Sequence, residues 1–132
     1  MGKNECKLIL HDLYFSKYDF SQERGEEDQE YSTSFQINYA VNSKDESRVK
    51  VTVDTTVTNK LSSLILNLQT VGIFGIDKDG IDETTYDRLI KANTLAIIFP
   101  FIRSQLTLLT TQPGLTPVIL PPININSLIE NQ

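Results

Sequence analysis

The sequence predicts an α+β fold in which a four-stranded antiparallel sheet is followed by one long helix and a short C-terminal helix. Three observations carry this prediction: segments that alternate apolar and polar residues, an apolar segment interrupted by a proline, and a proline-rich segment near the C-terminus. With 132 residues the chain is most simply one domain, residues 1–132. A chain of this size buries roughly two-thirds of the surface that its unfolded form exposes, which is enough for a core.

Three segments, residues 34–41, 49–57 and 64–69, alternate apolar and polar side chains. A period of two with the apolar residues on one side is typical of antiparallel strands that cover a core with one face. Short polar turns join the segments, at residues 42–47 and at Asn59 and Lys60. The three segments are therefore expected to form a meander.

The first segment, residues 6–20, is expected to join this sheet as a fourth, irregular strand that is buried on part of both faces. The next segment, residues 21–30, is acidic, contains Gly25 and has no apolar residue. It predicts a solvated connection, in preference to a cation site at Glu26, Glu27 and Asp28. In a regular first strand, Leu8, Leu10 and Tyr14 would share one side, and Ile9, Leu13 and Phe15 the other.

Glycines flank Ile73 and Phe74 within residues 71–76. Glycine inside a strand pattern suggests a bulge or a close approach of another segment. The acidic residues 77–80 that follow, DKDG, predict a turn. Asp82 then suits a helix N-cap, and Glu83 lies in the first turn, where the helix dipole favours a carboxylate.

A helix is expected from about Glu83 to Gln112. Within it, residues 95–102 are apolar all round, so this part must be buried in a core or against a partner. These eight residues are too few for a membrane span, which needs about 20 apolar residues. Pro100 removes one intrahelical hydrogen bond and should kink or break the helix.

Proline and glycine residues determine where regular secondary structure ends in the rest of the chain. Pro113 and Gly114 should end the long helix. Residues 115–125 contain Pro117, Pro121 and Pro122 and are expected to be extended. Residues 126–132 can form at most two helical turns.

The net charge and the number of cysteines limit which partners and which cellular compartment are expected. The net charge is −5, from 12 basic and 17 acidic residues, which argues against nucleic-acid binding because phosphate contacts need a basic patch. The single cysteine, Cys6, allows no disulfide within the chain and fits a reducing, cytoplasmic setting. The N-terminal residues have no long apolar segment with a cleavage site, so no secretory signal and no membrane insertion are expected.

Groups that could carry catalysis or hold a metal are sparse. His11 is the one histidine, and Asp12 beside it would point to the opposite face of a regular strand. One cysteine and one histidine cannot make a conventional zinc site. We therefore expect a binding protein with no catalytic residues, no metal and no cofactor. Four residues resemble part of a calcium loop but lack its spacing, which favours a turn followed by an N-cap: Asp77, Asp79, Asp82 and Glu83.

An apolar groove lined by Ile73, Phe74 and residues 115–125 would suit an extended peptide, which such a groove holds by shape and apolar area. Composition alone favours the alternative that these are ordinary core residues.

Three motifs resemble the SecB family of protein-export chaperones. Residues 69–76, QTVGIFGI, resemble the Gln-x-x-Gly-Ile-Phe-x-Ile at the end of the family's fourth strand. Residues 98–103, IFPFIR, are similar to Leu-Phe-Pro-Tyr-x-Arg in the family's main helix. Residues 115–128, LTPVILPPININSL, resemble its proline-rich strip. The motifs occur in the family's order and spacing, over residues 61–129, so the joint match is specific.

The resemblance implies that the long helix packs on the four-stranded sheet and that the protein is a tetramer, built as a dimer of dimers. It also implies an ATP-independent holdase with an apolar groove for unfolded or preprotein polypeptides. Subunit contacts are then expected at Phe99, Phe101, Ile102 and Leu106. The groove is expected at Phe35, Ile37, Tyr39, Ile73, Phe74, Pro122, Ile123 and Ile125.

Departures from the family pattern bear on the partners. Export members dock on the SecA motor through an acidic patch on the sheet and through a C-terminal tail. Here Ile65 and Asn67 stand where the patch would have Leu and Glu, Lys17 falls at an acidic position, and the sequence ends at Gln132 without that tail. These differences argue against SecA docking of the usual kind. An antitoxin chaperone and a structural or adaptor oligomer therefore remain alternatives to an export holdase.

Overall fold

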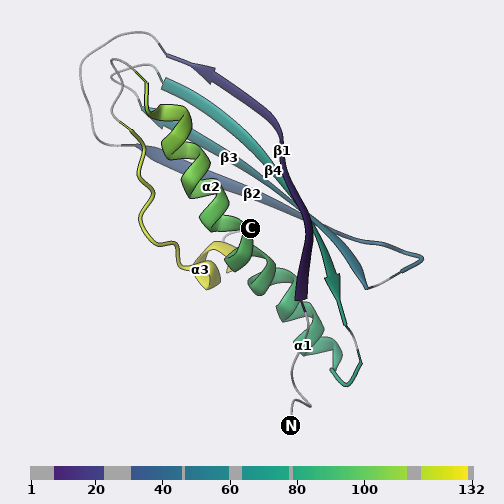
Figure 1. Cartoon of the computed structure of the whole chain (residues 1–132). Helices are drawn as coiled ribbons and strands as arrows, with labels where there is room; N and C mark the ends of the chain where they lie inside the picture. Colours follow the sequence, from purple (N-terminus) through teal and green to yellow (C-terminus); the bar gives the residue numbers. More distant parts are fainter. Residues whose placement is uncertain are drawn as a thin grey trace.

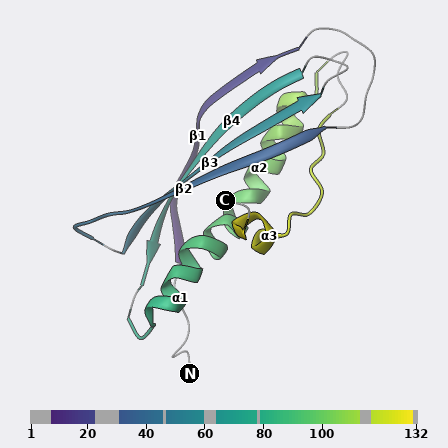
Figure 2. The same cartoon turned by 180° about the vertical axis from the view of Figure 1, so that it is seen from behind.

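In the computed structural model, one long helix lies obliquely across one face of a twisted four-stranded sheet (Figure 1). The reverse view shows the strands in front of that helix (Figure 2). The structure describes residues 8–22, 31–45, 47–59, 64–77, 79–112 and 117–130. The elements are β1 (Leu8–Ser21), β2 (Ser32–Val41), β3 (Arg48–Asn59), β4 (Leu64–Ile76), α1 (Glu83–Arg88), the π-helical turn η1 (Leu89–Asn93), α2 (Thr94–Thr110) and α3 (Ile125–Glu130).

This arrangement confirms the predicted α+β fold, with its sheet, long helix and short C-terminal helix. Some of the sequence predictions concern residues that lie outside the described ranges: Cys6, Glu26, Glu27, Asp28, Lys60, Pro113 and Gly114.

The strands lie in the order β1-β4-β3-β2, and every neighbouring pair is antiparallel. β2, β3 and β4 form the predicted meander, whereas β1 pairs with β4, so β1 and β2 are the two edges of the sheet. The turn between β2 and β3 is stabilised by Asn42, whose Oδ1 accepts hydrogen bonds from the backbone N–H groups of Lys44 (2.9 Å) and Asp45 (3.3 Å).

β4 runs without interruption through the glycine-flanked segment. Its register with β3 shows no shift, so the bulge that the glycines suggested is absent between these two strands. The close approach that they suggested is present. A Cβ atom on Gly72 would lie 2.8 Å from Phe74 Cε1 and 3.1 Å from Ile98 Cδ1. The absence of a side chain at Gly72 therefore leaves the space that Phe74 and Ile98 of α2 occupy.

β1 contains two bulges that the sequence did not reveal. Its register with β4 shifts between Leu10 and Asp12 and again between Phe15 and Lys17. An extra residue at a bulge resets which face the following side chains occupy. The predicted division of the apolar residues was wrong because it assumed a regular strand. Leu8, Leu10, Leu13 and Phe15 all pack against the core, whereas Ile9 and Tyr14 lie on the opposite face, 51% and 42% exposed.

The core lies between the helix-side face of the sheet and α2. Alternate residues of β3 and β4 point toward α2, as the period of two predicted. Full burial of each large aliphatic side chain contributes about 1.5–3 kcal/mol, so this face supplies most of the stabilisation. The apolar residues of β3, β4 and α2 that are at most 2% exposed are Val49, Val51, Val53, Val57, Leu64, Leu66, Leu68, Phe74, Ile76, Leu95, Ile98, Ile102 and Leu106.

The start of the long helix is capped as predicted. Asp82 Oδ1 accepts a hydrogen bond from the backbone N–H of Thr85 at 2.7 Å. The hydrogen bonds from Thr85 lower the pKa of the Asp82 carboxyl. In the preceding turn, Asp77 Oδ1 accepts from the Asp79 N–H at 3.0 Å, and Gly80 has a φ of 80° that favours glycine. These contacts confirm a turn followed by an N-cap.

Pro100 was predicted to kink or break the long helix, and the helix continues through it without a break. Pro100 has no N–H for the carbonyl of Ala96, and both residues are exposed, so water can bond to that carbonyl. The irregular turn is instead η1, where the Thr94 hydroxyl donates to the carbonyl of Ile90. Together α1, η1 and α2 span 28 residues, long and apolar enough to cross a membrane, although a core helix has the same character.

Gly72→Ala is expected to lower the free energy of unfolding by about 1–3 kcal/mol, because the added methyl group would press on Phe74 and Ile98. Gly75→Ala is the matched control, since its methyl group would meet only the exposed ring of His11, which can turn into solvent. Urea denaturation of both variants measures the difference. Equal losses of stability would contradict the importance of the space at Gly72.

Candidate functional site

The predicted groove residues of β2 share the helix-side face of the sheet. Phe35, Ile37 and Tyr39 alternate along β2, opposite core-facing residues of β3. The ring of Phe35 meets the ring of Phe99 on α2 edge-on, with centroids 5.1 Å apart and an interplanar angle of 82°. Aromatic rings favour this geometry because the edge of one faces the π cloud of the other. Ile37 is buried, whereas Phe35 and Tyr39 are half-buried at the edge of the sheet.

Tyr39 ties β2 to the π-helical turn. Its hydroxyl donates a hydrogen bond to the carbonyl of Lys91 in η1, at 3.0 Å. Burial raises the pKa of Tyr39 to about 12, and the negative charge of Asp87 adds to the effect. Asp87 also forms an ion pair with Lys91 Nζ at 3.1 Å. The hydroxyl therefore stays neutral, and remains a donor, throughout the neutral pH range.

A proline-rich strip, residues 117–124, is fastened to α2 by two threonines. Thr107 Oγ1 donates to the carbonyl of Val118 at 2.9 Å, and the Val118 N–H donates to Thr110 Oγ1 at 2.7 Å. The exposure of the strip alternates, as expected for an extended chain with one side against the helix. The exposed fractions are 2% for Val118, 76% for Ile119 and 6% for Leu120.

The strip runs alongside α2 and leads into α3 (Figure 1). α3 packs beside η1. Asn124 Oδ1 accepts a hydrogen bond from the Ser127 N–H at 3.1 Å and so caps α3. Ile123 and Ile125 are half-buried and pack against the core, whereas Pro122 is exposed. Because η1 touches both Tyr39 and α3, the groove residues of β2 and of the strip converge on this turn.

Two further groove candidates, Ile73 and Phe74, lie on opposite faces of β4. Phe74 pairs with Leu10 on the helix side and is completely buried. Ile73 pairs with Asp12 on the other face and is half-buried there. The structure therefore does not bring these two residues to one surface. Neither residue therefore adds exposed surface beside the half-buried residues of β2 and the strip.

The four residues expected at subunit contacts divide between two sides of α2. Phe99 is 3% exposed, and Ile102 and Leu106 are completely buried against the chain's own sheet. Phe101 is 45% exposed on the opposite side. Leu108, 65% exposed, lies seven residues further along the same side. Sequence reasoning missed Leu108, although its spacing from Phe101 was the available signal.

β1 adds two exposed aromatic residues that sequence reasoning also missed. Tyr18 and Phe20 pair with Leu68 and Leu66, so they project on the helix-side face of the sheet. They are nevertheless 57% and 38% exposed. The bulge between Phe15 and Lys17 decides their orientation, and that bulge was not visible in the sequence.

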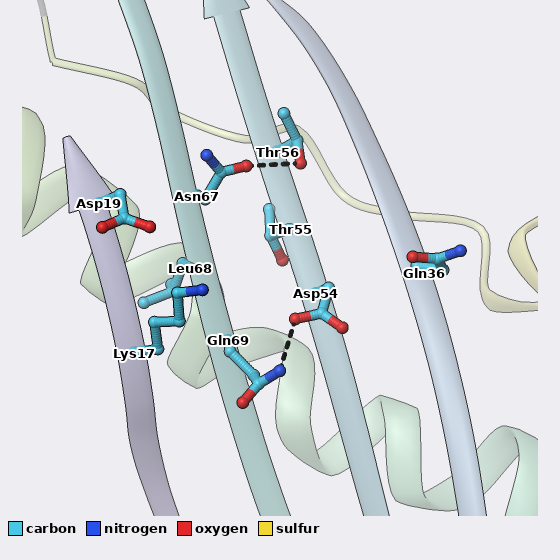
Figure 3. Close-up of a pocket in the computed structure, with 9 residues that line it drawn as sticks. All are labelled: Lys17, Asp19, Gln36, Asp54, Thr55, Thr56, Asn67, Leu68 and Gln69. Atoms are coloured by element: carbon cyan, nitrogen blue, oxygen red, sulfur yellow. Dashed lines mark hydrogen bonds between the residues drawn. The ribbon is translucent and has the colours of Figure 1, made fainter. Parts of the chain in front are cut away.

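The opposite face of the sheet has a polar hollow of about 300 Å³ (Figure 3). Gln69 Nε2 donates to Asp54 Oδ1 at 2.9 Å, and Thr56 Oγ1 donates to Asn67 Oδ1 at 3.0 Å. Lys17 and Asp19 of β1 also line this hollow. Cationic, anionic and amide groups are therefore mixed where the resemblance would place an acidic patch.

The described part of the chain offers little for metal binding or catalysis. No three His, Cys, Asp or Glu side chains there are grouped so that they could hold a metal ion. The first bulge of β1 places His11 over Gly75, on the same face as Asp12, and not on the opposite face as predicted. His11 and Asp12 form no hydrogen bond with each other.

Tyr39→Phe is expected to lower the free energy of unfolding by about 0.5–1.5 kcal/mol at neutral pH, because the bond to the Lys91 carbonyl is lost. Since folding raises the pKa of Tyr39 from 10.0 to about 12, its contribution is complete below pH 10 and is lost as the pH rises toward 12. Urea denaturation at several pH values measures this. Tyr14→Phe, at an exposed tyrosine of the other face, is the control. A pH-independent difference from wild type would contradict the expectation.

Comparisons with known proteins agree with this architecture. A family model described as preprotein translocase subunit SecB matches residues 6–132. An uncharacterized protein of Methanocaldococcus jannaschii is 31% identical over 70 residues, which cover 53% of this chain and 44% of that protein. The protein-export protein SecB of Anaplasma phagocytophilum is 29% identical over 77 residues, 58% of this chain and 49% of the relative. These two alignments span about half the length of the relatives.

A longer alignment joins the chain to the protein-export protein SecB of Nitrosococcus oceani, with 28% identity over 96% of this chain and 78% of the relative. Among solved structures, a SecB-like chaperone of Mycobacterium tuberculosis, in complex with a peptide from the HigA1 antitoxin, has a similar fold. The TM-score is 0.72 at 15% identity, over 89% of this chain and 88% of that one. Because the family model spans almost the whole sequence, the chain belongs to the SecB family.

Proposed function

We propose that this protein is an ATP-independent holdase that binds unfolded or preprotein polypeptides in the cytoplasm. Membership of the SecB chaperone family is the observation that carries the proposal. The binding surface is the seam between β2, α2 and the strip, where apolar side chains are held half-buried by their own packing. Such a surface suits an extended polypeptide, because it offers apolar area with little demand for a particular sequence.

Within this seam, the proposed contacts are those that the fold leaves partly accessible. Phe35 and Tyr39 supply aromatic surface on β2, with the buried Ile37 between them. The strip supplies the exposed Pro122 and the half-buried Ile123, and α3 supplies the half-buried Ile125 at its first position. Ile119, the most exposed large apolar residue of the strip, extends this surface along α2.

A dedicated chaperone of one partner is the second candidate. The observation that favours it is the fold shared with the M. tuberculosis chaperone, which was solved with a peptide from an antitoxin. The mixed charges around Lys17, Asp19 and Asp54 also differ from an acidic docking patch for a motor protein. An export role through SecA is therefore the less supported branch of the proposal.

We further propose that copies of the chain assemble, as a tetramer built from two dimers, through the outer side of α2. Phe101 and Leu108 are large apolar residues on one side of α2 that this chain leaves exposed, and exposed apolar surface of this kind can mark a contact with another protein. Tyr18 and Phe20 of β1 add exposed aromatic surface on the same helix-bearing side of the sheet. The buried Phe99, Ile102 and Leu106 act indirectly, by fixing α2 on the sheet.

The holdase proposal predicts that the protein, without ATP, suppresses aggregation of several unfolded clients at near-stoichiometric amounts. Light scattering of reduced insulin and of heat-denatured citrate synthase measures it. Ile119→Ser should weaken suppression, whereas Ile65→Ser, at an exposed isoleucine on the opposite face of the sheet, should not. No suppression by the wild-type protein would refute the general holdase. Co-purification of one small partner in that case would favour the dedicated chaperone.

The assembly proposal predicts different effects for two phenylalanines of α2. Phe99→Ala should lower the free energy of unfolding by about 3–5 kcal/mol, because Phe99 is 3% exposed in the core. Phe101→Ala should leave the fold intact, as judged by circular dichroism, but reduce the assembled mass, as measured by light scattering after size exclusion. A Phe101→Ala protein with the wild-type mass would contradict the proposed contact.

A further inference from the structure

The helix-side residues of β2 form a straight row of apolar side chains. The row consists of every second residue of the strand: Phe35, Ile37, Tyr39 and Val41. Each of them lies opposite a helix-side residue of β3, and the pairing of the two strands has no shift in register. Residues two apart in a strand are separated by about 6.5–7 Å. The row therefore presents apolar groups at a constant repeat.

The rest of the chain covers this row only in part. β2 is an edge strand, so only β3 flanks it within the sheet. Ile37 is 9% exposed, whereas Phe35 and Tyr39 on either side of it are half-buried, and Val41 is 41% exposed. The row thus has a buried residue between two partly accessible rings, and an accessible end at Val41. A ligand that lay along β2 would meet these accessible side chains.

The two extended walls of the seam, β2 and the strip, are uncharged. None of the ten residues of β2 carries a charge, and neither does any residue of the described strip, residues 117–124. Contact with these walls therefore gains from burial of apolar surface and requires no charge on the ligand. Edge strands commonly carry charged residues or proline, which discourage another extended chain from lying beside them. β2 contains neither, which favours an extended chain with one apolar side as the occupant of this surface.

We propose that clients are recognised by apolar side chains at every second residue of an extended segment that lies along β2. This inference rests on the proposed holdase function and names the sequence pattern of its clients. An extended client has the same two-residue repeat as β2, so its inward side chains fit between those of Phe35, Tyr39 and Val41.

The proposed pattern excludes a helical client segment. A helix places its apolar stripe at intervals of three and four residues and is about 10–12 Å wide, so it does not match the row of β2. In an extended client, the alternate side chains point away from the row and can be polar or charged. The net charge of −5 on this chain favours basic residues among them.

The test compares fluorescent peptides of identical composition, each about nine residues long, which is enough to follow β2 from Phe35 to Val41. One peptide has its apolar residues at every second position, one has them at the helical positions i, i+3, i+4, i+7 and i+8, and one has them clustered at one end. Fluorescence anisotropy gives the affinity of each for the assembled full-length protein. The alternating peptide should bind about ten-fold more tightly than either isomer, because each isomer turns some apolar side chains away from the row.

Val41→Ser should lower the affinity for the alternating peptide about three-fold, because an exposed apolar contact at the end of the row is lost. Ala40→Ser is the matched control, since it places the same side chain at the neighbouring exposed position, on the opposite face of β2. It should leave the affinity unchanged. Circular dichroism and the mass after size exclusion should match the wild-type protein in both variants. Val41→Thr replaces Val41→Ser, under the same criteria, should the latter fail to fold.

The outcomes separate this inference from the holdase proposal. Equal affinity for the three isomers overturns the inference and leaves the holdase intact, and tighter binding of the helical isomer overturns it by assigning the seam to a helical client. Unchanged affinity in the Val41 variant overturns the placement along β2. A change of assembled mass in that variant overturns it by assigning the row to a subunit contact. Binding of no peptide, together with no suppression of aggregation, refutes the holdase itself.

Discussion

The close contact between α2 and β4 at Gly72 is the constraint on which the rest of the structure depends. Because Gly72 lacks a side chain, Ile98 of α2 can settle directly on the sheet. That contact limits how far the helix can stand from the strands, and the core residues of helix and sheet pack between them. The same separation between α2 and the sheet allows the ring of Phe99 to contact the ring of Phe35 on the edge strand β2. A helix held further away would leave the aromatic row of β2 without a partner.

The position of α2 also determines where the proline-rich strip can lie. Thr107 and Thr110 present their hydroxyls on the flank that faces Val118, and both backbone groups of that residue are satisfied. The prolines that follow have no N–H to satisfy and resist folding into a helix. An extended, mostly apolar segment is thus held at the side of the helix by few bonds. One side of α2 consequently packs in the core, its flank bonds to the strip, and another side leaves Phe101 and Leu108 exposed.

Much of this fold could be predicted from the sequence, because alternation and capping are local properties. The buried valines of β3 and the cap at Asp82 follow from patterns within a few residues. The bulges of β1 could not be predicted, since they depend on how that strand meets β4, more than fifty residues away. Without them, Tyr14 was assigned to the wrong face and the projection of Tyr18 was missed.

The candidate site was predicted in part. The residues of β2 and the strip were found because each follows a local pattern, whereas Ile73 and Phe74 were taken together from a motif although neighbours in a strand face opposite ways. Val41 continues the apolar row of β2 but was not among the predicted groove residues. Its exposure became visible only in the folded chain, because alternation alone does not show which residues of a row stay uncovered.

The bulges of β1 have a consequence for the edge of the sheet. An edge strand exposes unpaired backbone groups, and another extended chain could add to it as a further strand. The regular stretches of β1 are short, because the ladder is interrupted after Leu10 and again after Phe15. An added strand would lose its hydrogen-bond register at each interruption. The irregular edge at β1 thus disfavours the addition of a further strand there, whereas the other edge, β2, has no shift in its register with β3.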